Sequence, residues 1–242
     1  MKYSIQILLV FCFVFSISIH SDEVKIPFTE EFVEISAYSA SKNIRNCSIR
    51  IKYPRLVKSK VLNSGIMRKI NRTLKKEFLD IQRYDNEYQC NPSAGRNDPA
   101  FYLEVKYEIK YNRGPFLSVF YSAVGYLAGA PHPENVFKTF NFDLKTGHQI
   151  LYEDFFDPTM NYPGFVDNLV YGELFEMGVL SSQEEFNEVK KRRYDYYFDS
   201  NKLVLINLYS IHAMQSLEVQ LPYEKLMSVL NKKRLHILPN IH

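Results

Sequence analysis

A strict alternation of apolar and polar side chains over Phe101–Tyr111 constrains the fold of this chain more than any other feature. Every second residue in this run is aromatic or aliphatic, and the residues between them are mainly Glu and Lys. A two-residue period of this kind is typical of a β-strand with one buried face. Asn112–Pro115 supplies turn-forming residues and Phe116–Tyr126 follows it, so the sequence predicts a long antiparallel hairpin.

The segment that follows, up to Phe156, predicts a loop, a further strand and a tight turn. The loop is Gly129–Pro133, and the strand is indicated by the alternation of Phe140, Phe142 and Leu144 with polar residues. The turn is Asp143–Gly147, because glycine at its end can take a positive φ and the aspartate can accept hydrogen bonds from the amides ahead of it.

The remaining segments place the chain in the α+β class, as a curved antiparallel sheet with helices packed against it. Apolar residues recur every fourth position from Leu62 to Phe78, which predicts a helix over Val61–Tyr84. A Ser-x-x-Glu capping box predicts that another helix begins near Ser181 or Ser182. Further strands are predicted over Phe32–Tyr38, Cys47–Tyr53, Tyr194–Phe198, Leu203–Tyr209 and Leu217–Leu221, and further helices over Phe165–Met177 and Pro222–Leu230.

The first 21 residues are predicted to be a signal peptide. Lys2 supplies a positive charge, Ile5–Ile19 is largely apolar, and Ser16-x-Ser18 offers a small-x-small cleavage site. A membrane anchor is the competing interpretation, but the apolar run is short for a span, which needs about 20 residues. We therefore expect a single mature domain over residues 22–242, secreted or periplasmic and without a permanent membrane anchor.

Two cysteines, Cys47 and Cys90, remain in the predicted mature chain. In an oxidising compartment a pair of cysteines predicts one disulfide bond. A Cys47–Cys90 bridge would close a loop of about 44 residues and would stabilise the fold by about 4 kcal/mol on the chain-entropy estimate. Two unpaired thiols are the alternative.

The charges are distributed unevenly along the chain. Lys42–Lys76 contains twelve Lys or Arg residues and no acidic residue, whereas Asp143–Glu188 contains ten acidic residues and one base, Lys145. One interpretation is that folding brings the two regions together as surface ion pairs, which contribute little individually. The other is that the basic region binds an anionic envelope polymer, or that the acidic region binds a cationic protein. The predicted export disfavours nucleic acid as a partner.

The chain shows no strong catalytic pattern. Ser210 and His212 are close in sequence but lack a nucleophile elbow, and the histidine and cysteine spacings do not match a zinc site. Glu153, Asp154 and Asp157 are able to imitate a hydrolase carboxylate pair, although acidic residues before a proline are more typical of a loop or the start of a helix. The sequence therefore predicts a non-enzymatic protein with no metal site and no cofactor.

Five segments together resemble a known family of unknown function. They are Gly129–Pro133, Phe142–Gly147, Leu151–Phe156, Leu203–Tyr209 and Leu221–Leu226. The family occurs in the extracytoplasmic part of RsiV-type anti-sigma factors and beside the catalytic domain of PdaC-type peptidoglycan deacetylases of bacteria. The resemblance implies one α+β domain of the cell envelope.

The resemblance also implies what this domain binds. The RsiV-type proteins imply a protein partner such as lysozyme and a role in envelope stress, and His132, Glu153, Asp154 and Asp157 are the residues predicted to contact it. The PdaC-type proteins imply an accessory domain that binds cell-wall glycan. An uncharacterised hydrolase is the remaining alternative.

Overall fold

The computed structural model describes residues 33–44, 46–59, 62–79, 100–191, 193–209 and 217–231. The predicted signal peptide lies outside these residues, so its cleavage stays a prediction. Cys90, His212 and the predicted polar loop between residues 85 and 99 also lie outside them.

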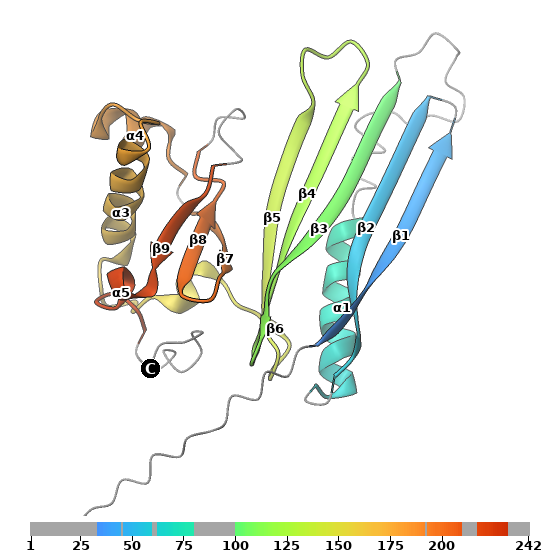
Figure 1. The fold of residues 1–242 in the computed structure, drawn as a ribbon, viewed down its shortest axis with the longest axis horizontal. Helices are drawn as coiled ribbons and strands as arrows, with labels where there is room; N and C mark the ends of the chain where they lie inside the picture. The colour runs from blue at the N-terminus through green and yellow to red at the C-terminus, as the bar shows by residue number, and fades with distance from the viewer. Residues whose placement is uncertain are drawn as a thin grey trace, which may run out of the picture.

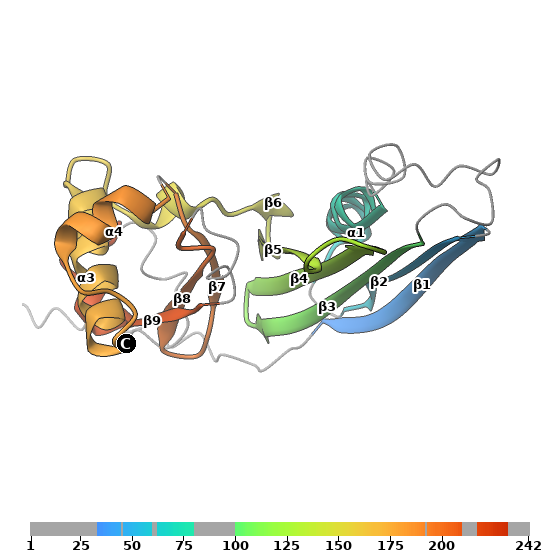
Figure 2. The same ribbon diagram turned by 90° about the horizontal axis from the view of Figure 1, so that it is seen from above.

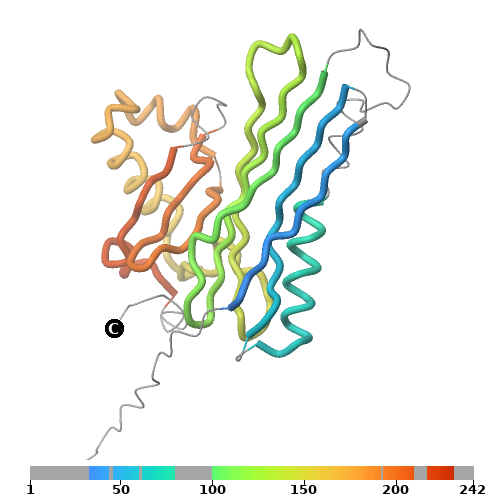
Figure 3. The backbone as a smooth tube through the Cα atoms, turned by 45° about the vertical axis from the view of Figure 1, so that its right-hand side comes forward, coloured from blue at the N-terminus to red at the C-terminus, as the bar shows by residue number. Residues whose placement is uncertain are grey.

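A long six-stranded sheet forms the larger part of the molecule (Figures 1 and 3). The predicted hairpin is confirmed, because its two strands pair antiparallel along their length with Phe101 opposite Leu127 and Arg113 opposite Phe116. In sheet order the strands are β1 (Glu34–Ile44), β2 (Cys47–Lys58), β3 (Phe101–Arg113), β4 (Phe116–Leu127), β5 (Glu134–Asp143) and β6 (His148–Gln149).

One pair of strands in this sheet differs from the expectation of a purely antiparallel sheet. β2 and β3 run parallel, with Cys47 opposite Phe101 and Ile51 opposite Val105. A parallel pair needs a long crossover connection, and here that connection contains α1 (Ser64–Leu79). The sheet is therefore mixed, and the other neighbouring pairs are antiparallel.

Helix α1 covers one face of the long sheet (Figure 2). Its buried residues Ile70, Leu74 and Phe78 form the apolar stripe that the four-residue spacing predicts. The ring of Phe78 packs edge-on against Tyr121 of β4, with the ring centroids 4.8 Å apart. The described part of the helix reaches Leu79, and its predicted continuation to Tyr84 lies outside the described residues.

The tight turn after β5 is confirmed in detail. Asp143 Oδ1 accepts a hydrogen bond from the Lys145 amide at 2.7 Å, and Oδ2 accepts one from the Thr146 hydroxyl at 2.9 Å. Gly147 has a φ of +66°, and a Cβ at this position would lie 3.0 Å from the Ile66 side chain of α1. Glycine is therefore required twice, for its backbone conformation and for the close approach of the helix.

The rest of the chain forms a smaller layered unit beside the long sheet (Figure 1). The predicted helix start is confirmed, because Ser182 is the N-cap and its hydroxyl accepts a hydrogen bond from the Glu185 amide. The return bond differs from a capping box, because Glu185 Oε2 accepts from the amide of Ser181, one residue before the N-cap. The elements of this smaller unit are η1 (Tyr152–Phe155), α3 (Tyr162–Glu176), α4 (Gln183–Val189), β7 (Asp195–Phe198), β8 (Lys202–Ile206), β9 (Val219–Pro222) and α5 (Tyr223–Leu226).

Two elements of this unit are shorter than predicted. Strand β8 ends at Ile206, because Asn207 has a φ of +52° and leaves the extended conformation. Helix α5 ends at Leu226, although we expected it to continue to Leu230. Leu230 instead forms an isolated bridge with Phe156.

Buried polar side chains join the two sheets. Asn141 of β5 donates a hydrogen bond to the Tyr196 carbonyl at 2.7 Å, and Thr139 accepts one from the Tyr196 amide at 3.2 Å. Ser118 of β4 accepts one from the Phe198 amide and donates to Asn141 Oδ1 at 2.6 Å. β7 pairs with β8 on one side only. On its other side, these side chains supply hydrogen-bond partners to the backbone N–H and C=O groups of β7.

Among the described residues, none of the helices combines the length and the apolar character that crossing a membrane requires.

Candidate functional site

The three carboxylates predicted to bind a protein partner lie together in and after η1. Glu153 forms an ion pair with Arg193. Asp154 Oδ2 accepts a hydrogen bond from the Leu151 amide at 3.0 Å, which stabilises the first turn of η1. Asp157 Oδ1 accepts hydrogen bonds from the amide and the hydroxyl of Thr159. Each carboxylate therefore has a role inside the chain, and the assignment of these residues to a partner stays a prediction.

Other acidic residues of the region 143–188 are also engaged within the chain. Asp167 accepts a hydrogen bond from Tyr194 at 2.6 Å and pairs with Lys190. Glu173 pairs with Lys225 of α5 at 2.7 Å. Hydrogen bonds from the Ser181 amide and hydroxyl lower the pKa of Glu185. Much of the acidic region thus stabilises local structure.

His132 does not share a site with these carboxylates. It lies exposed in the loop between β4 and β5, with its Nδ1 atom 3.1 Å from the Pro133 carbonyl. The ten residues of β5 span about 33 Å, and the carboxylates follow the opposite end of that strand. The four predicted contact residues therefore do not converge.

Cys47 lies at the start of β2 and is buried, with 4% of its surface exposed. Its predicted partner Cys90 lies outside the described residues. The Cys47–Cys90 disulfide therefore stays a prediction, to be tested by peptide mapping of the unreduced protein.

The basic region differs from the acidic region, because several of its cations lie together on the outer face of one helix, α1. Five cationic residues of this helix are exposed, while the apolar residues between them face the sheet. We call this surface the basic helix face. It consists of Arg68, Lys69, Arg72, Lys75 and Lys76.

The sheet holds this helix firmly. Asn71 Nδ2 donates to the Leu56 carbonyl of β2 at 2.8 Å, and Asn71 Oδ1 accepts from the Leu56 amide at 2.8 Å. At the start of the helix, Asn63 Oδ1 accepts a hydrogen bond from the Gly65 amide at 2.6 Å. The Asn71 hydrogen bonds therefore fix the basic helix face to the sheet through β2.

Among the described residues, no carboxylate forms an ion pair with the basic helix face. Arg68, Arg72 and Lys76 recur every four residues, so their side chains are neighbours on the helix surface. Each like-charge pair at this spacing destabilises a helix by about 0.2–0.5 kcal/mol. An anionic ligand would remove that repulsion, which makes this face the best candidate for a functional surface.

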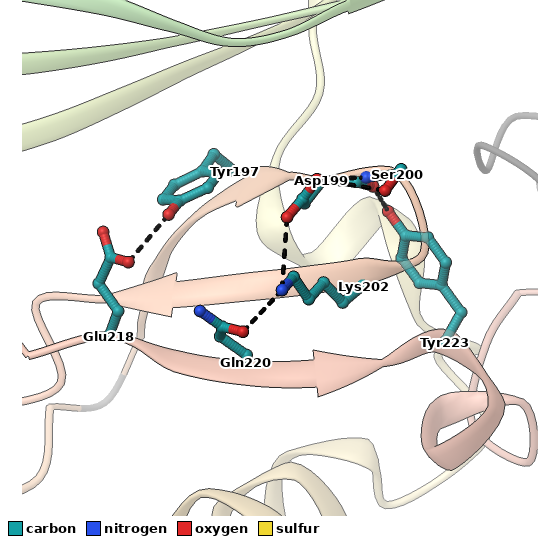
Figure 4. A network of polar contacts seen from close by, with 7 residues as sticks. All are labelled: Tyr197, Asp199, Ser200, Lys202, Glu218, Gln220 and Tyr223. Carbon is teal, nitrogen blue, oxygen red and sulfur yellow. Dashed lines mark hydrogen bonds and ion pairs between the residues drawn. The ribbon is translucent and has the colours of Figure 1, made fainter.

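A second polar cluster lies on the three-stranded sheet, and its side chains contact one another (Figure 4). Tyr197 donates a hydrogen bond to Glu218 at 3.0 Å, and burial followed by the charge of Glu218 raises the pKa of Tyr197. Lys202 Nζ lies 2.7 Å from Gln220 Oε1 and 3.5 Å from Asp199 Oδ2. These contacts join neighbouring strands and the turn between them, so the cluster stabilises the sheet.

Within the described part of the chain, no group of three or more His, Cys, Asp or Glu side chains is arranged to hold a metal ion.

Sequence reasoning identified the basic helix face only as one of two charged regions. The structure distinguishes the basic region from the acidic region, because several acidic residues are already paired within the chain. Those pairs join residues far apart in the sequence, such as Glu173 and Lys225.

The comparisons with known proteins agree with the resemblance that the motifs predict. Residues 40–135 match the family model described as Deacetylase PdaC. This segment includes α1 and the first strands of the long sheet. No curated protein matches the chain.

Two solved structures of DUF3298 family proteins have the same fold. One, from Bacteroides fragilis NCTC 9343, has a TM-score of 0.61 and 14% sequence identity, and the alignment covers 84% of this chain and 95% of that one. The other, from Pseudomonas aeruginosa PAO1, has a TM-score of 0.64 and 12% identity, with coverage of 86% and 97%. The predicted family resemblance and the α+β class are confirmed, and at these identities the likeness concerns the fold alone.

Proposed function

We propose that this chain, with its PdaC-type segment and DUF3298-type fold, is a binding domain for an anionic polymer of the cell envelope. The basic helix face is the contact surface. The observation that supports the proposal is the set of exposed cations on α1 that meet no carboxylate among the described residues.

A polymer suits this surface better than a small anion does. The cations run from Arg68 to Lys76, which spans about 12 Å along the helix axis. Flexible, exposed lysine and arginine side chains attract repeated negative charges without enclosing any single one. The ligand chemistry that fits is a chain of phosphate or carboxylate groups.

Titration calorimetry with poly(glycerol phosphate) tests the proposal. The variant Arg68→Gln/Arg72→Gln/Lys76→Gln should bind about threefold to one hundredfold more weakly than the wild type, because each exposed ion pair contributes about 0.2–1 kcal/mol. Binding by the wild type should weaken as salt rises, since the Debye length falls to about 8 Å at physiological ionic strength.

A matched control separates local charge from net charge. Arg113→Gln/Lys138→Gln/Lys191→Gln also removes three positive charges, but from β3, β5 and the segment after α4. This variant should retain binding close to that of the wild type. Equal losses in the two triple variants would show that net charge alone attracts the polymer, and would contradict a specific surface.

Lysozyme provides the second arm of the same experiment, because a cationic protein is the partner that the family resemblance implied. Reversal of Glu153, Asp154 and Asp157 to Lys tests that interpretation. Heat with lysozyme that disappears in this variant, together with no heat from the polymer, would replace the proposal with the protein-binding alternative.

A further inference from the structure

Strand β1 forms one edge of the long sheet (Figure 1). It is eleven residues long and pairs with β2, and among the described residues no strand pairs with its other side. The opposite edge of the sheet is β6, which has only two residues. A long edge strand presents a row of backbone donors and acceptors to which another strand can pair.

The hairpin between β1 and β2 determines which backbone groups face outward. Ile44 pairs with Cys47, and only two residues separate them. In a two-residue hairpin the flanking residues exchange both hydrogen bonds, and the direction then alternates along the strand. The N–H groups of Ala37, Ser39 and Ser41 therefore point away from β2.

The sequence of β1 is self-complementary in an antiparallel arrangement. Its only charged residues are Glu34 and Lys42, and each lies four positions from Tyr38. When two copies of β1 pair about Tyr38, Glu34 of each copy lies opposite Lys42 of the other. Opposite charges placed in this way stabilise a cross-strand pair.

Tyr38 is suited to the centre of such an interface. Its side chain is 39% exposed, so its ring is available for contact with a second copy. The Arg55 guanidinium donates to its hydroxyl at 2.6 Å and lies 4.9 Å from its ring centroid, so the ring is held in place. Two such rings would meet at a non-hydrogen-bonded pair, where cross-strand side chains are closest.

We propose that two copies of this chain dimerise through antiparallel pairing of β1 with its counterpart, centred on Tyr38. The two-fold axis is perpendicular to the sheet, so the two six-stranded sheets join into one. The interface is closed, because each copy uses the same edge and the other edge of each sheet is short.

This dimer would place both α1 helices on the same face of the joined sheet. Tyr38 pairs with Tyr53, and the Tyr53 ring contacts Phe78 of α1 at 6.5 Å between centroids. The two copies of β2 would lie three strand spacings apart, about 14 Å. Helices about 10–12 Å in diameter fit side by side at that distance. The inference does not depend on the proposed function, because dimerisation is measured without polymer.

Sedimentation velocity over a range of protein concentrations tests the dimer. The wild type should shift from monomer to dimer as concentration rises. Ser39→Pro should remain monomeric, because proline removes an outward N–H group without removing a hydrogen bond to β2. Circular dichroism of the variant should match the wild type, which shows that the monomer folds.

Charge reversal tests the register independently of the proline variant. Glu34→Lys and Lys42→Glu should each lose the dimer when alone, because like charges then face one another. A mixture of these two single variants should form a heterodimer, and the double variant should regain the homodimer. Failure of both rescues would overturn the proposed register.

A cysteine scan gives the final measurement. Tyr38→Cys should form an interchain disulfide on mild oxidation, whereas Ala37→Cys should not, because residue 37 lies opposite residue 39 of the other copy. A wild type that is monomeric at all concentrations, or a dimer that persists in Ser39→Pro, would overturn the proposal.

Discussion

At the scale of single residues, two buried tyrosines of the smaller unit differ in one respect that matters for stability. Tyr209 is fully buried, and its hydroxyl has no hydrogen-bond partner among the described residues. Tyr194 is also buried, but its hydroxyl donates to Asp167. A buried polar group is costly when unpaired and favourable when paired.

Replacement of each tyrosine by phenylalanine should therefore have opposite effects. Tyr209→Phe should be neutral or should stabilise the protein by up to about 1 kcal/mol, because it removes an unsatisfied hydroxyl. Tyr194→Phe should destabilise it by about 1.5–3 kcal/mol, because it removes a hydrogen bond to a charged group. Urea unfolding measures the free energy of unfolding of both variants. Equal losses would contradict the difference in hydrogen bonding between the two hydroxyl groups.

At the scale of elements, the position of the three-stranded sheet depends on side chains rather than on a continuous ladder of backbone bonds. Ser118, Thr139 and Asn141 are buried and contact the backbone of β7. Asn207 adds a fourth contact by donating to the Phe137 carbonyl at 2.7 Å. Buried polar groups of this kind select one arrangement, because other arrangements leave them unpaired.

Asn141→Ala tests this arrangement. The substitution leaves the Tyr196 carbonyl without the Asn141 donor and Ser118 without the Asn141 acceptor, so the free energy of unfolding should fall by about 2–5 kcal/mol. Asn135→Ala in the same strand is the control and should change it by less than about 0.5 kcal/mol. A loss in Asn141→Ala no larger than the control would show that the junction is held by apolar packing alone.

At the scale of the whole molecule, the buried tyrosines determine how stability depends on alkaline pH. Burial raises the pKa of Tyr152, Tyr194, Tyr197 and Tyr223, and it raises the pKa of Tyr209 to about 12. The unfolded value is 10.0. A group whose folded pKa is raised contributes its full stability below the unfolded pKa and loses it as pH rises through the folded pKa.

These tyrosines should therefore not change the free energy of unfolding below pH 10, and they should lower it steeply above pH 10. Urea unfolding at a series of alkaline pH values measures the fall. Tyr209→Phe should make the decline between pH 10 and about 12 shallower. Stability that stays constant in this range would show that the tyrosines ionise in the folded protein.

The sequence alone determined the local structure of this protein. The alternation over Phe101–Tyr111, the Asp143–Gly147 turn and the Ser182 cap were all predicted correctly, because each depends on neighbouring residues and a single backbone preference. The apolar stripe of α1 was predicted for the same reason.

Only the tertiary structure decided how these elements combine. The parallel pairing of β2 with β3 requires knowledge of where α1 lies, and the local pattern of either strand is the same in a parallel or an antiparallel pair. The choice between the two charged regions also needed the fold. The partners of Glu153 and Glu173 are 40 and 52 residues away in the chain. Charge is a property of the sequence, but whether a charge is already paired is a property of distances in space.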